Sequence, residues 1–251
     1  MTVRGIILAG GTGSRLWPIT KVTNKHLLPV GHYPMIYYPL HALIDAGIED
    51  LMIVTGPDHM GHIVTLLGSG QQWNVRFTYQ VQDSAGGIAQ ALGLARDFAR
   101  GDRLVAVLGD NVFDYPLKQF ISSFEHQGEG ARILLYTVQD PGRYGVPELD
   151  GDRIVAIEEK PMNPKSNYCV TGIYAYNPDV FSVIDTLRPS GRGELEITDV
   201  NNHYIRQGNL KFDFLEGHWT DAGTFESFSR ASALAENIRL SRFEPDALPA
   251  R

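Results

Sequence analysis

The sequence has only one cysteine, Cys169, among its 251 residues, and it has no long apolar run. A lone cysteine excludes an internal disulfide and a thiolate metal cluster, and it fits a reducing compartment. No stretch approaches the roughly 20 apolar residues that a membrane helix needs. The apolar run at 6–9 is bounded by glycine and is too short for a signal peptide. We therefore expect a cytoplasmic protein with no membrane partner.

Basic residues are also scarce. The chain contains 22 Lys and Arg against 29 Asp and Glu, which gives a net charge of -7. A general nucleic-acid binder needs a basic face for its phosphate contacts, so this class of protein is disfavoured. A small phosphorylated ligand remains compatible, because a few cations in a cleft can oppose the charge of the whole protein.

Apolar runs alternate with segments of helical spacing, most regularly in the first 110 residues. The apolar runs predict strands at 3–9, 51–54, 75–81, 104–108, 131–137, 153–158, 170–176 and 210–215. The helical spacing predicts helices at 34–46, 57–67, 88–98, 117–125, 179–187, 197–207 and 224–240. This alternation predicts an α/β fold with a Rossmann-like, mostly parallel but mixed sheet flanked by helices. The tail at 241–251 has two prolines and little periodicity, so we expect it to be loosely held.

A glycine-rich segment follows the first predicted strand, with the sequence Leu-Ala-Gly-Gly-Thr-Gly-Ser-Arg at 8–15. Glycines at the end of a buried strand let backbone N–H groups approach a phosphate. Arg15 can bind phosphate oxygens, and Lys25 is close enough in sequence to return to the same phosphates. A turn without a ligand is the alternative. No Gly-Lys-Ser/Thr follows, and Leu16 stands where Gly-x-Gly-x-x-Gly needs glycine, so a P-loop protein and a dehydrogenase are disfavoured.

Two aspartates, Asp110 and Asp221, each follow a predicted strand. Ligands bind at this edge of open α/β sheets, and magnesium favours one or two protein carboxylates with phosphate and water completing its shell. An aspartate before a turn is more often a cap or an Asx turn, as Asp199 illustrates. The pattern alone therefore leaves both interpretations open.

Four segments, at 8–16, 18–20, 25–30 and 34–40, closely resemble those of sugar-phosphate nucleotidylyltransferases, in particular the glucose-1-phosphate thymidylyltransferase branch. Further matches follow in the family's order at 143–146, 158–161, 167–174 and 192–199, so that the resemblance covers residues 3–235. It implies a single nucleotidyltransferase domain at 1–240. Its nucleotide-binding half is expected at 1–110 and its sugar-phosphate-binding half at 111–240.

The resemblance also assigns roles near the phosphates and the base. Arg15, Lys25, Asp110 and Asp221 match the family's catalytic set, and the two aspartates match the ligands of its Mg2+ cofactor. A glutamine amide at Gln82 offers the paired donor and acceptor that suit a pyrimidine edge. The residues implied to bind the nucleotide are Leu8, Gly10, Gly11, Thr12, Gly13, Gln82 and Gly87.

The second half matches the family segments that surround a hexose 1-phosphate. A carboxylate at Glu159 suits paired sugar hydroxyls, and Lys160 with Arg192 can hold the phosphate. A charge run at the end of a strand is otherwise usually only a solvated surface. The residues implied to bind the sugar phosphate are Leu108, Gly145, Glu159, Lys160, Val170, Tyr174 and Arg192.

The chain departs from the family pattern at several positions. Ala222 stands where threonine is usual, Asp83 replaces proline, and Gly86 replaces aspartate. His26 replaces the glutamine expected beside Lys25, and we interpret it as a packing residue. The changes near Gln82 leave the preference between dTTP and UTP open.

We therefore expect transfer of a nucleotidyl group from dTTP to glucose 1-phosphate, giving dTDP-glucose and pyrophosphate. The resemblance also implies a homo-oligomer. The alternatives are a UTP-dependent or other sugar-1-phosphate nucleotidylyltransferase and a catalytically silent nucleotide-sensing homologue. The chain resembles a short form without the family's C-terminal helical extension, so feedback control through that extension is not expected.

Overall fold

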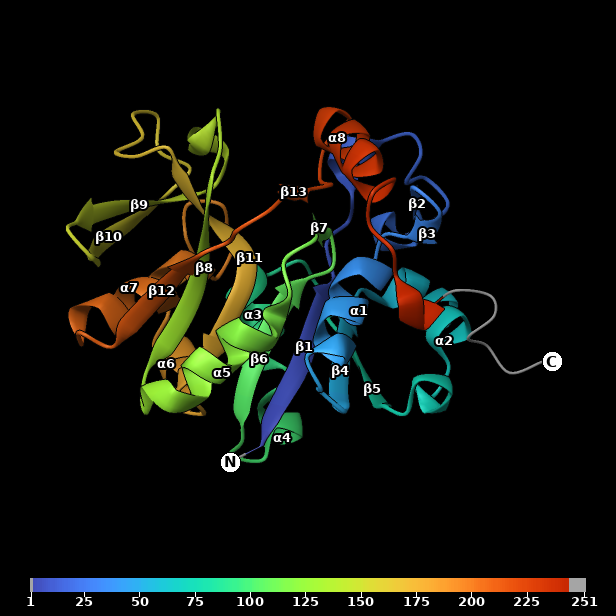
Figure 1. Cartoon of the computed structure of the whole chain (residues 1–251), viewed down its shortest axis with the longest axis horizontal. Helices are drawn as coiled ribbons and strands as arrows, with labels where there is room; N and C mark the ends of the chain where they lie inside the picture. The colour runs from blue at the N-terminus through green and yellow to red at the C-terminus, as the bar shows by residue number, and fades with distance from the viewer. Residues whose placement is uncertain (1, 244–251) are drawn as a thin grey trace. The chain divides into compact units, whose positions relative to one another are not determined.

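The computed structural model describes residues 2–243 and contains a seven-stranded, mostly parallel sheet flanked by helices (Figure 1). The strand order in the sheet is β12-β8-β11-β6-β1-β4-β5. These strands are β1 Val3–Ala9, β4 Asp50–Thr55, β5 Arg76–Val81, β6 Arg103–Leu108, β8 Ala131–Thr137, β11 Tyr168–Tyr176 and β12 Leu210–Phe214. β1 pairs in parallel with β4, and β4 with β5, whereas β11 runs antiparallel to β8. The predicted mixed α/β fold is confirmed.

Short strand pairs lie outside this sheet. They are β2 Pro29–Val30 with β3 Tyr33–Pro34, β7 Asn111–Phe113 with β13 Trp219–Asp221, and β9 Gly145–Asp150 with β10 Arg153–Glu159. The α-helices are α1 Tyr37–Asp45, α2 Met60–Leu67, α3 Ile88–Gly93, α4 Arg96–Ala99, α5 Leu117–Gln127, α6 Val180–Asp185, α7 Ile197–Arg206 and α8 Phe225–Ala235. Single 3-10 turns are η1 Ser14–Leu16, η2 Lys25–Leu27, η3 Pro57–His59, η4 Gln71–Trp73, η5 Pro141–Arg143 and η6 Ser241–Phe243.

The chain forms two compact units, and each is built from separate stretches of sequence. The glycine-loop unit comprises residues 4–85, 107–118 and the chain from Gly217 onward. The hairpin unit, named for β9–β10, comprises residues 2–3, 86–106 and 119–216. Each unit thus joins segments that are distant in sequence, whereas the predicted halves meet at a single boundary after residue 110.

Burial explains why the strongest strand predictions match the structure. Ile6 and Ile7 in β1 are completely buried, and the neighbouring strand positions are nearly so. A strand covered on both faces shows a continuous apolar run, which is the pattern on which the prediction depended. Both ends of β1 and β8 lie where the sequence predicts them.

Several predicted helices are interrupted. The segment predicted at 57–67 begins with η3 before α2, and the one at 88–98 divides into α3 and α4 after Gly93. The last helix, predicted to reach residue 240, ends at Ala235 because the next turns use shorter i to i+3 bonds, such as Ile238 N–H to the Ala235 carbonyl. β2, β3, β7, β9 and β13 were not predicted, since strands of two to six residues show little periodicity.

Part of the tail that was predicted to be loosely held is packed against the protein. Phe243 in η6 is buried and stacks on Tyr37 of α1, with 4.3 Å between ring centroids. The remainder of the predicted loose tail, 244–251, lies outside the described residues.

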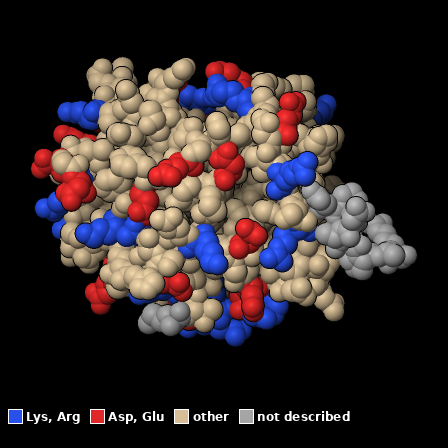
Figure 2. All heavy atoms as spheres, in the orientation of Figure 1, with Lys and Arg blue, Asp and Glu red and all other residues tan. Residues whose placement is uncertain are grey.

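No helix in the described part of the chain is long and apolar enough to cross a membrane. On the face shown in Figure 2, Lys and Arg side chains lie interspersed with Asp and Glu. The basic residues on that face are therefore scattered among acidic ones.

Candidate functional site

The glycine loop leaves the carboxyl end of β1 and is shaped by its glycines. Gly13 has φ +66°, a left-handed conformation that favours glycine, and its carbonyl accepts a hydrogen bond from Thr20 Oγ1 at 2.9 Å. A methyl group added at Gly10 would overlap Oε1 of Gln82, so the Gln82 amide lies directly over the loop. Gln82 therefore lies against the loop that contains the predicted nucleotide-binding residues Gly10, Gly11, Thr12 and Gly13.

Lys25 and Asp110 form an ion pair beside this loop. Lys25 Nζ lies 2.5 Å from Asp110 Oδ2, and the two side chains are 11% and 12% exposed. Asp110 follows the end of β6, where the Gly109 N–H donates to the Leu8 carbonyl of β1 at 2.9 Å. A methyl group at Gly11 would lie 3.8 Å from Lys25 Nζ, which places the ammonium next to the loop.

Electrostatics keep Asp110 ionised and its neighbour His26 neutral. Burial alone would raise the pKa of Asp110, but the charge of Lys25, that of His26 where acid protonates it, and the hydrogen bonds from Lys25 and Asn111 bring that pKa down to about 2. Burial, followed by the charge of Lys25, lowers the pKa of His26 to about 3, against a smaller opposing effect of Asp110. His26 is therefore uncharged at neutral pH.

Arg15 and Asp221 meet at Gly223. A methyl group on Gly223 would lie 2.9 Å from Asp221 Oδ2 and 3.2 Å from Arg15 Nη2. Asp221 ends β13, and its Oδ2 accepts hydrogen bonds from the Gly223 N–H at 3.1 Å and from Ser227 Oγ at 3.3 Å. The absence of a side chain at Gly223 therefore allows the guanidinium and the carboxylate to occupy the same corner.

Of the two predicted metal ligands, Asp110 directly precedes β7 and Asp221 ends β13. β7 and β13 pair so that Asp221 stands opposite Asn111, and the Ala222 N–H donates to the Asp110 carbonyl at 2.8 Å. Among the described residues, no group of three or more His, Cys, Asp or Glu side chains is placed to hold a metal. Magnesium bound mainly by phosphate and water needs only one or two carboxylates, so Asp110 and Asp221 fit this ion.

A second cluster lies in the hairpin unit and lines a pocket of about 520 Å³. Glu159 ends β10; its Oε1 lies 3.2 Å from Lys160 Nζ and 3.5 Å from Arg192 Nη2. Its other oxygen accepts a hydrogen bond from Thr198 Oγ1 at 2.6 Å. Arg192 is also paired with Glu196 at 2.7 Å. The pocket is lined by two cations, Lys160 and Arg192, and by four carboxylates, those of Glu158, Glu159, Glu196 and Asp199.

Some of the remaining predicted binding residues lie beside these two clusters, and others are strand or loop residues elsewhere in the two units. Gly145 pairs with Glu159 across β9 and β10, next to the second cluster. Gly87 belongs to the hairpin unit, where a methyl group on it would overlap the Leu195 carbonyl oxygen, so it packs on that segment. Leu8 and Leu108 are strand residues of the glycine-loop unit, Val170 and Tyr174 are buried in β11, and Thr12 is exposed.

Comparison with known proteins adds an independent line of support. The family model for nucleotidyl transferases matches residues 4–238. The chain belongs to the nucleotidyl transferase family. Glucose-1-phosphate thymidylyltransferases of Xanthomonas campestris and Neisseria meningitidis are 45% and 42% identical to it, each over 94% of this chain and 82% and 84% of their own length.

Solved structures of nucleotidyl transferases have the same fold. A Bacillus anthracis structure in complex with sucrose, described as a candidate glucose-1-phosphate thymidylyltransferase, is 57% identical with a TM-score of 0.92, covering 95% of this chain and 97% of that one. A UDP-glucose pyrophosphorylase complexed with UDP-glucose is 25% identical with a TM-score of 0.83, covering 95% and 100%. This nucleotidyl transferase therefore resembles enzymes that use different nucleotides.

Some residues of both clusters were not assigned from the sequence. Glu196 and Thr198 belong to a matched segment, yet their contacts with Arg192 and Glu159 become visible only in the structure. Gly223 and Asn24 were likewise overlooked, because a missing side chain and a buried amide give no pattern in a single sequence. The sequence did offer one signal for Gly223, which is that it follows the predicted metal ligand Asp221 by two residues.

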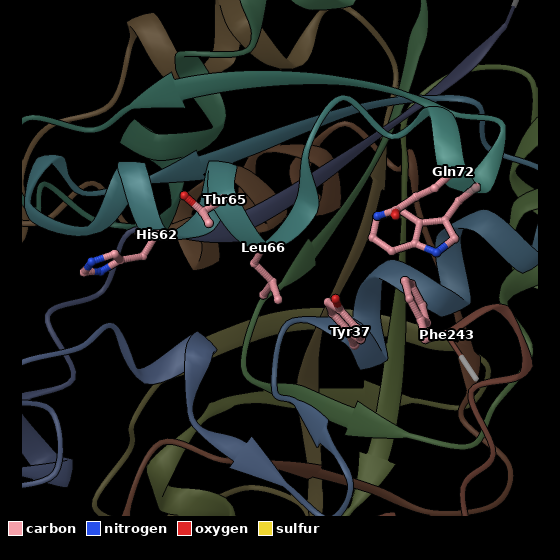
Figure 3. Close-up of a pocket in the computed structure, with 7 residues that line it drawn as sticks. Tyr37, His62, Thr65, Leu66, Gln72 and Phe243 are labelled. Carbon is pink, nitrogen blue, oxygen red and sulfur yellow. The ribbon is translucent and has the colours of Figure 1, made fainter. Parts of the chain in front are cut away.

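A further pocket of this nucleotidyl transferase, of about 450 Å³, contains none of the predicted site residues. Figure 3 shows Tyr37 and Phe243 side by side at one end and His62 at the other. Trp73 completes an aromatic cluster, with its ring centroid 4.7 Å from that of Phe243. These contacts hold η6 against α1 and η4.

Proposed function

We propose that this protein transfers a thymidylyl group from dTTP to glucose 1-phosphate, releasing pyrophosphate and forming dTDP-glucose. The observation that supports it most strongly is the Lys25–Asp110 pair beside the glycine loop, with Arg15 and Asp221 at the adjoining corner. The names of the relatives support the choice of substrates. A sensing homologue without activity would have no need of these four charged groups together.

In this proposal the glycine-loop unit binds the triphosphate. Backbone N–H groups of the loop, Lys25 and Arg15 offset the charge of the phosphates, and the Gln82 amide over Gly10 reads the pyrimidine. Asp110 and Asp221 would hold magnesium, which would neutralise charge on the phosphate oxygens and on the leaving pyrophosphate. The low pKa of Asp110 keeps its carboxylate available for this role at neutral pH.

The hairpin unit binds the sugar phosphate. Lys160 and Arg192 bind its phosphate, and Glu159, oriented by Thr198, accepts hydrogen bonds from the sugar hydroxyls. A phosphate oxygen of the sugar attacks the α-phosphorus of dTTP in line, while the bond to pyrophosphate breaks. The attacking oxygen is already anionic at neutral pH, so the chain needs no general base. Positioning and charge neutralisation provide the catalysis.

The decisive assay is magnesium-dependent release of pyrophosphate from glucose 1-phosphate with dTTP, UTP, CTP, GTP or ATP, each offered separately. We expect release chiefly with dTTP, and none after chelation of the metal. Release chiefly with UTP would replace the nucleotide in this proposal but retain the reaction. No release with any nucleotide, under conditions where the protein is folded, would contradict the reaction itself.

The metal ligands require a separate test. Asp110→Asn and Asp221→Asn should each reduce turnover by about 100-fold or more, because each removes a carboxylate from the metal. Asp58→Asn, which alters an exposed aspartate of the same unit, serves as the matched control. The homo-oligomer and the cytoplasmic location stay predictions; light scattering on the purified protein would measure the former.

A further inference from the structure

The segment that presents Lys25 has little regular structure of its own. η2 is one 3-10 turn of three residues, so its internal bonds are too few to fix a long side chain. Two polar side chains flank Lys25 in sequence, and both are buried: Asn24 is 6% exposed and His26 is 2% exposed. Burying polar groups is unfavourable unless they are hydrogen bonded. Their partners therefore indicate what they do.

Asn24 forms hydrogen bonds in two directions. Its Oδ1 accepts from the backbone N–H of His26 at 2.9 Å, and because an N–H only donates, this contact identifies the oxygen of the amide. Nδ2 therefore faces the sheet, where it donates to the Ala9 carbonyl and to Thr55 Oγ1, each at 3.4 Å. Asn24 thus ties the start of η2 to the carboxyl ends of β1 and β4.

His26 supports the same turn from the other side. Its Nδ1 lies 2.6 Å from Asn24 Oδ1, and since that oxygen only accepts, Nδ1 carries the proton. The ring lies against Gly109, where an added methyl group would be 2.7 Å from its Cδ2. The His26 carbonyl also accepts from the Ile36 N–H at 3.0 Å. The ring therefore fills the space between η2 and the residue that precedes Asp110.

We infer that Asn24 and His26 are positioning residues that hold Lys25 at the place where its ammonium meets Asp110. The inference rests on the proposed function, which assigns Lys25 to the triphosphate. Both residues act through Lys25: loss of the Asn24–His26 bond frees η2 to shift, and a shift of η2 moves Nζ away from Asp110 and from the glycine loop. Such a shift reduces catalysis more than it reduces folding.

The first test measures the position of Lys25 without using activity. Trace acetylation followed by mass spectrometry gives the reactivity of Lys25 relative to the exposed Lys118 in the same molecule. His26→Leu keeps a bulky buried side chain but loses the N–H that donates to Asn24. In this variant Lys25 should react about two- to tenfold faster, the factor that corresponds to one lost hydrogen bond. His26→Gln, whose amide can again donate to Asn24, should react nearly as the parent does.

Kinetics provide the second test. The kcat of His26→Leu should fall about 10- to 100-fold, as expected for a displaced phosphate-binding group, while KM for glucose 1-phosphate stays within about twofold. His26→Gln should restore most of the kcat. The kcat of the double variant Asn24→Ala, His26→Leu should be no lower than that of Asn24→Ala alone, because each single change already removes the same Asn24–His26 hydrogen bond. His41→Leu, another partly buried histidine of the same unit, is the matched control for lost packing.

The outcomes separate this inference from the proposed function. An inactive parent protein would contradict the proposed function, yet the acetylation series would still test the positioning pair. Unchanged Lys25 reactivity in a folded His26→Leu variant overturns the inference, and so does an equal rise in His41→Leu. If His26→Leu does not fold, Thr55→Val replaces it in the test. This variant removes the Thr55 hydroxyl, which accepts a hydrogen bond from Asn24 Nδ2. Its Lys25 should then react faster, and parent-like reactivity would overturn the inference.

Discussion

Lys25 and Asp110 in the glycine-loop unit form a single pair whose side chains are 11% and 12% exposed. In the hairpin unit, Arg192 is 43% exposed and lies within ion-pair distance of three carboxylates, those of Glu159, Glu194 and Glu196. Charges screened by water interact weakly, whereas a buried charge without its partner is costly. Substitutions in the first cluster should therefore affect both folding and activity. Substitutions in the second should chiefly affect substrate binding.

The largest effect should follow Lys25→Met. It leaves Asp110 buried without its cation, which should cost about 3–5 kcal/mol of unfolding free energy. Activity should fall about 100- to 1,000-fold, because a phosphate-binding cation is lost. Urea unfolding and pyrophosphate release measure the two quantities.

The double variant Lys25→Met, Asp110→Asn separates these effects. It should recover much of the stability, since no unpaired charge remains, and none of the activity. Lys118→Met, at an exposed lysine, controls for the loss of a positive charge. Equal stabilities of the single and double variants would show that the buried pair behaves like a surface pair.

The next effect concerns pH and stability. The pKa of His26 is about 3 in the folded protein and 6.5 in an unfolded chain, so the unfolded state binds more protons between these values. The unfolding free energy should therefore fall by about 1.4 kcal/mol for each pH unit below 6.5. Asp110 contributes only at lower pH: its pKa is lowered from 3.8 to about 2, so its stabilisation is lost as the pH falls through that window.

Urea unfolding at pH 7.5, 6.5, 5.5 and 4.5, in the absence of magnesium, measures this slope. His26→Gln should reduce it, and His32→Gln, at an exposed histidine, should leave it unchanged. Part of the slope should remain in His26→Gln because burial also lowers the pKa of His41, with smaller opposing effects of Asp45 and reinforcing effects of Arg242. An undiminished slope in His26→Gln would place the titrating groups elsewhere.

A smaller effect is expected for Arg192→Ala in the exposed cluster. KM for glucose 1-phosphate should rise about 10- to 100-fold, since a charged hydrogen bond to phosphate is lost, while the unfolding free energy changes by less than about 1 kcal/mol. Arg192→Lys should recover only part of the binding, because an ammonium cannot reproduce the planar fork that Glu196 orients. A large loss of stability in Arg192→Ala would remove the contrast between the two clusters.

The same contrast explains what the sequence could predict. Apolar runs such as β1 and β8 were located because burial on both faces leaves a continuous pattern. Lys25, Asp110, Glu159 and Arg192 were named from the family resemblance, and the structure places Lys25 against Asp110 and Glu159 against Arg192. These pairings are 85 and 33 residues apart in sequence, a separation at which periodicity carries no information.

Other features depend on three-dimensional contacts that no local pattern records. The division into two units is one example, because each unit joins distant stretches of chain. His26 is another: in place of the expected glutamine it was interpreted as a packing residue, and the structure adds a hydrogen bond to Asn24 across the turn of η2. Gly223 is a third, since the reason for a glycine there is the approach of Arg15 from the far end of the chain.

The smallest predicted effect tests the exposed cluster most directly. Glu194 Oε2 lies 3.3 Å from Arg192 Nη2, and its side chain is more exposed than that of Glu196, which holds the same guanidinium at 2.7 Å. Glu194→Gln removes the more loosely held competitor for the phosphate of the substrate and leaves Arg192 oriented by Glu196. KM for glucose 1-phosphate should fall about two- to threefold, with the unfolding free energy within about 0.5 kcal/mol of the parent value. A tenfold rise in KM would instead mean that Glu194 orients Arg192 as strongly as a buried partner does, and the exposed cluster would then have to be treated as one coupled unit.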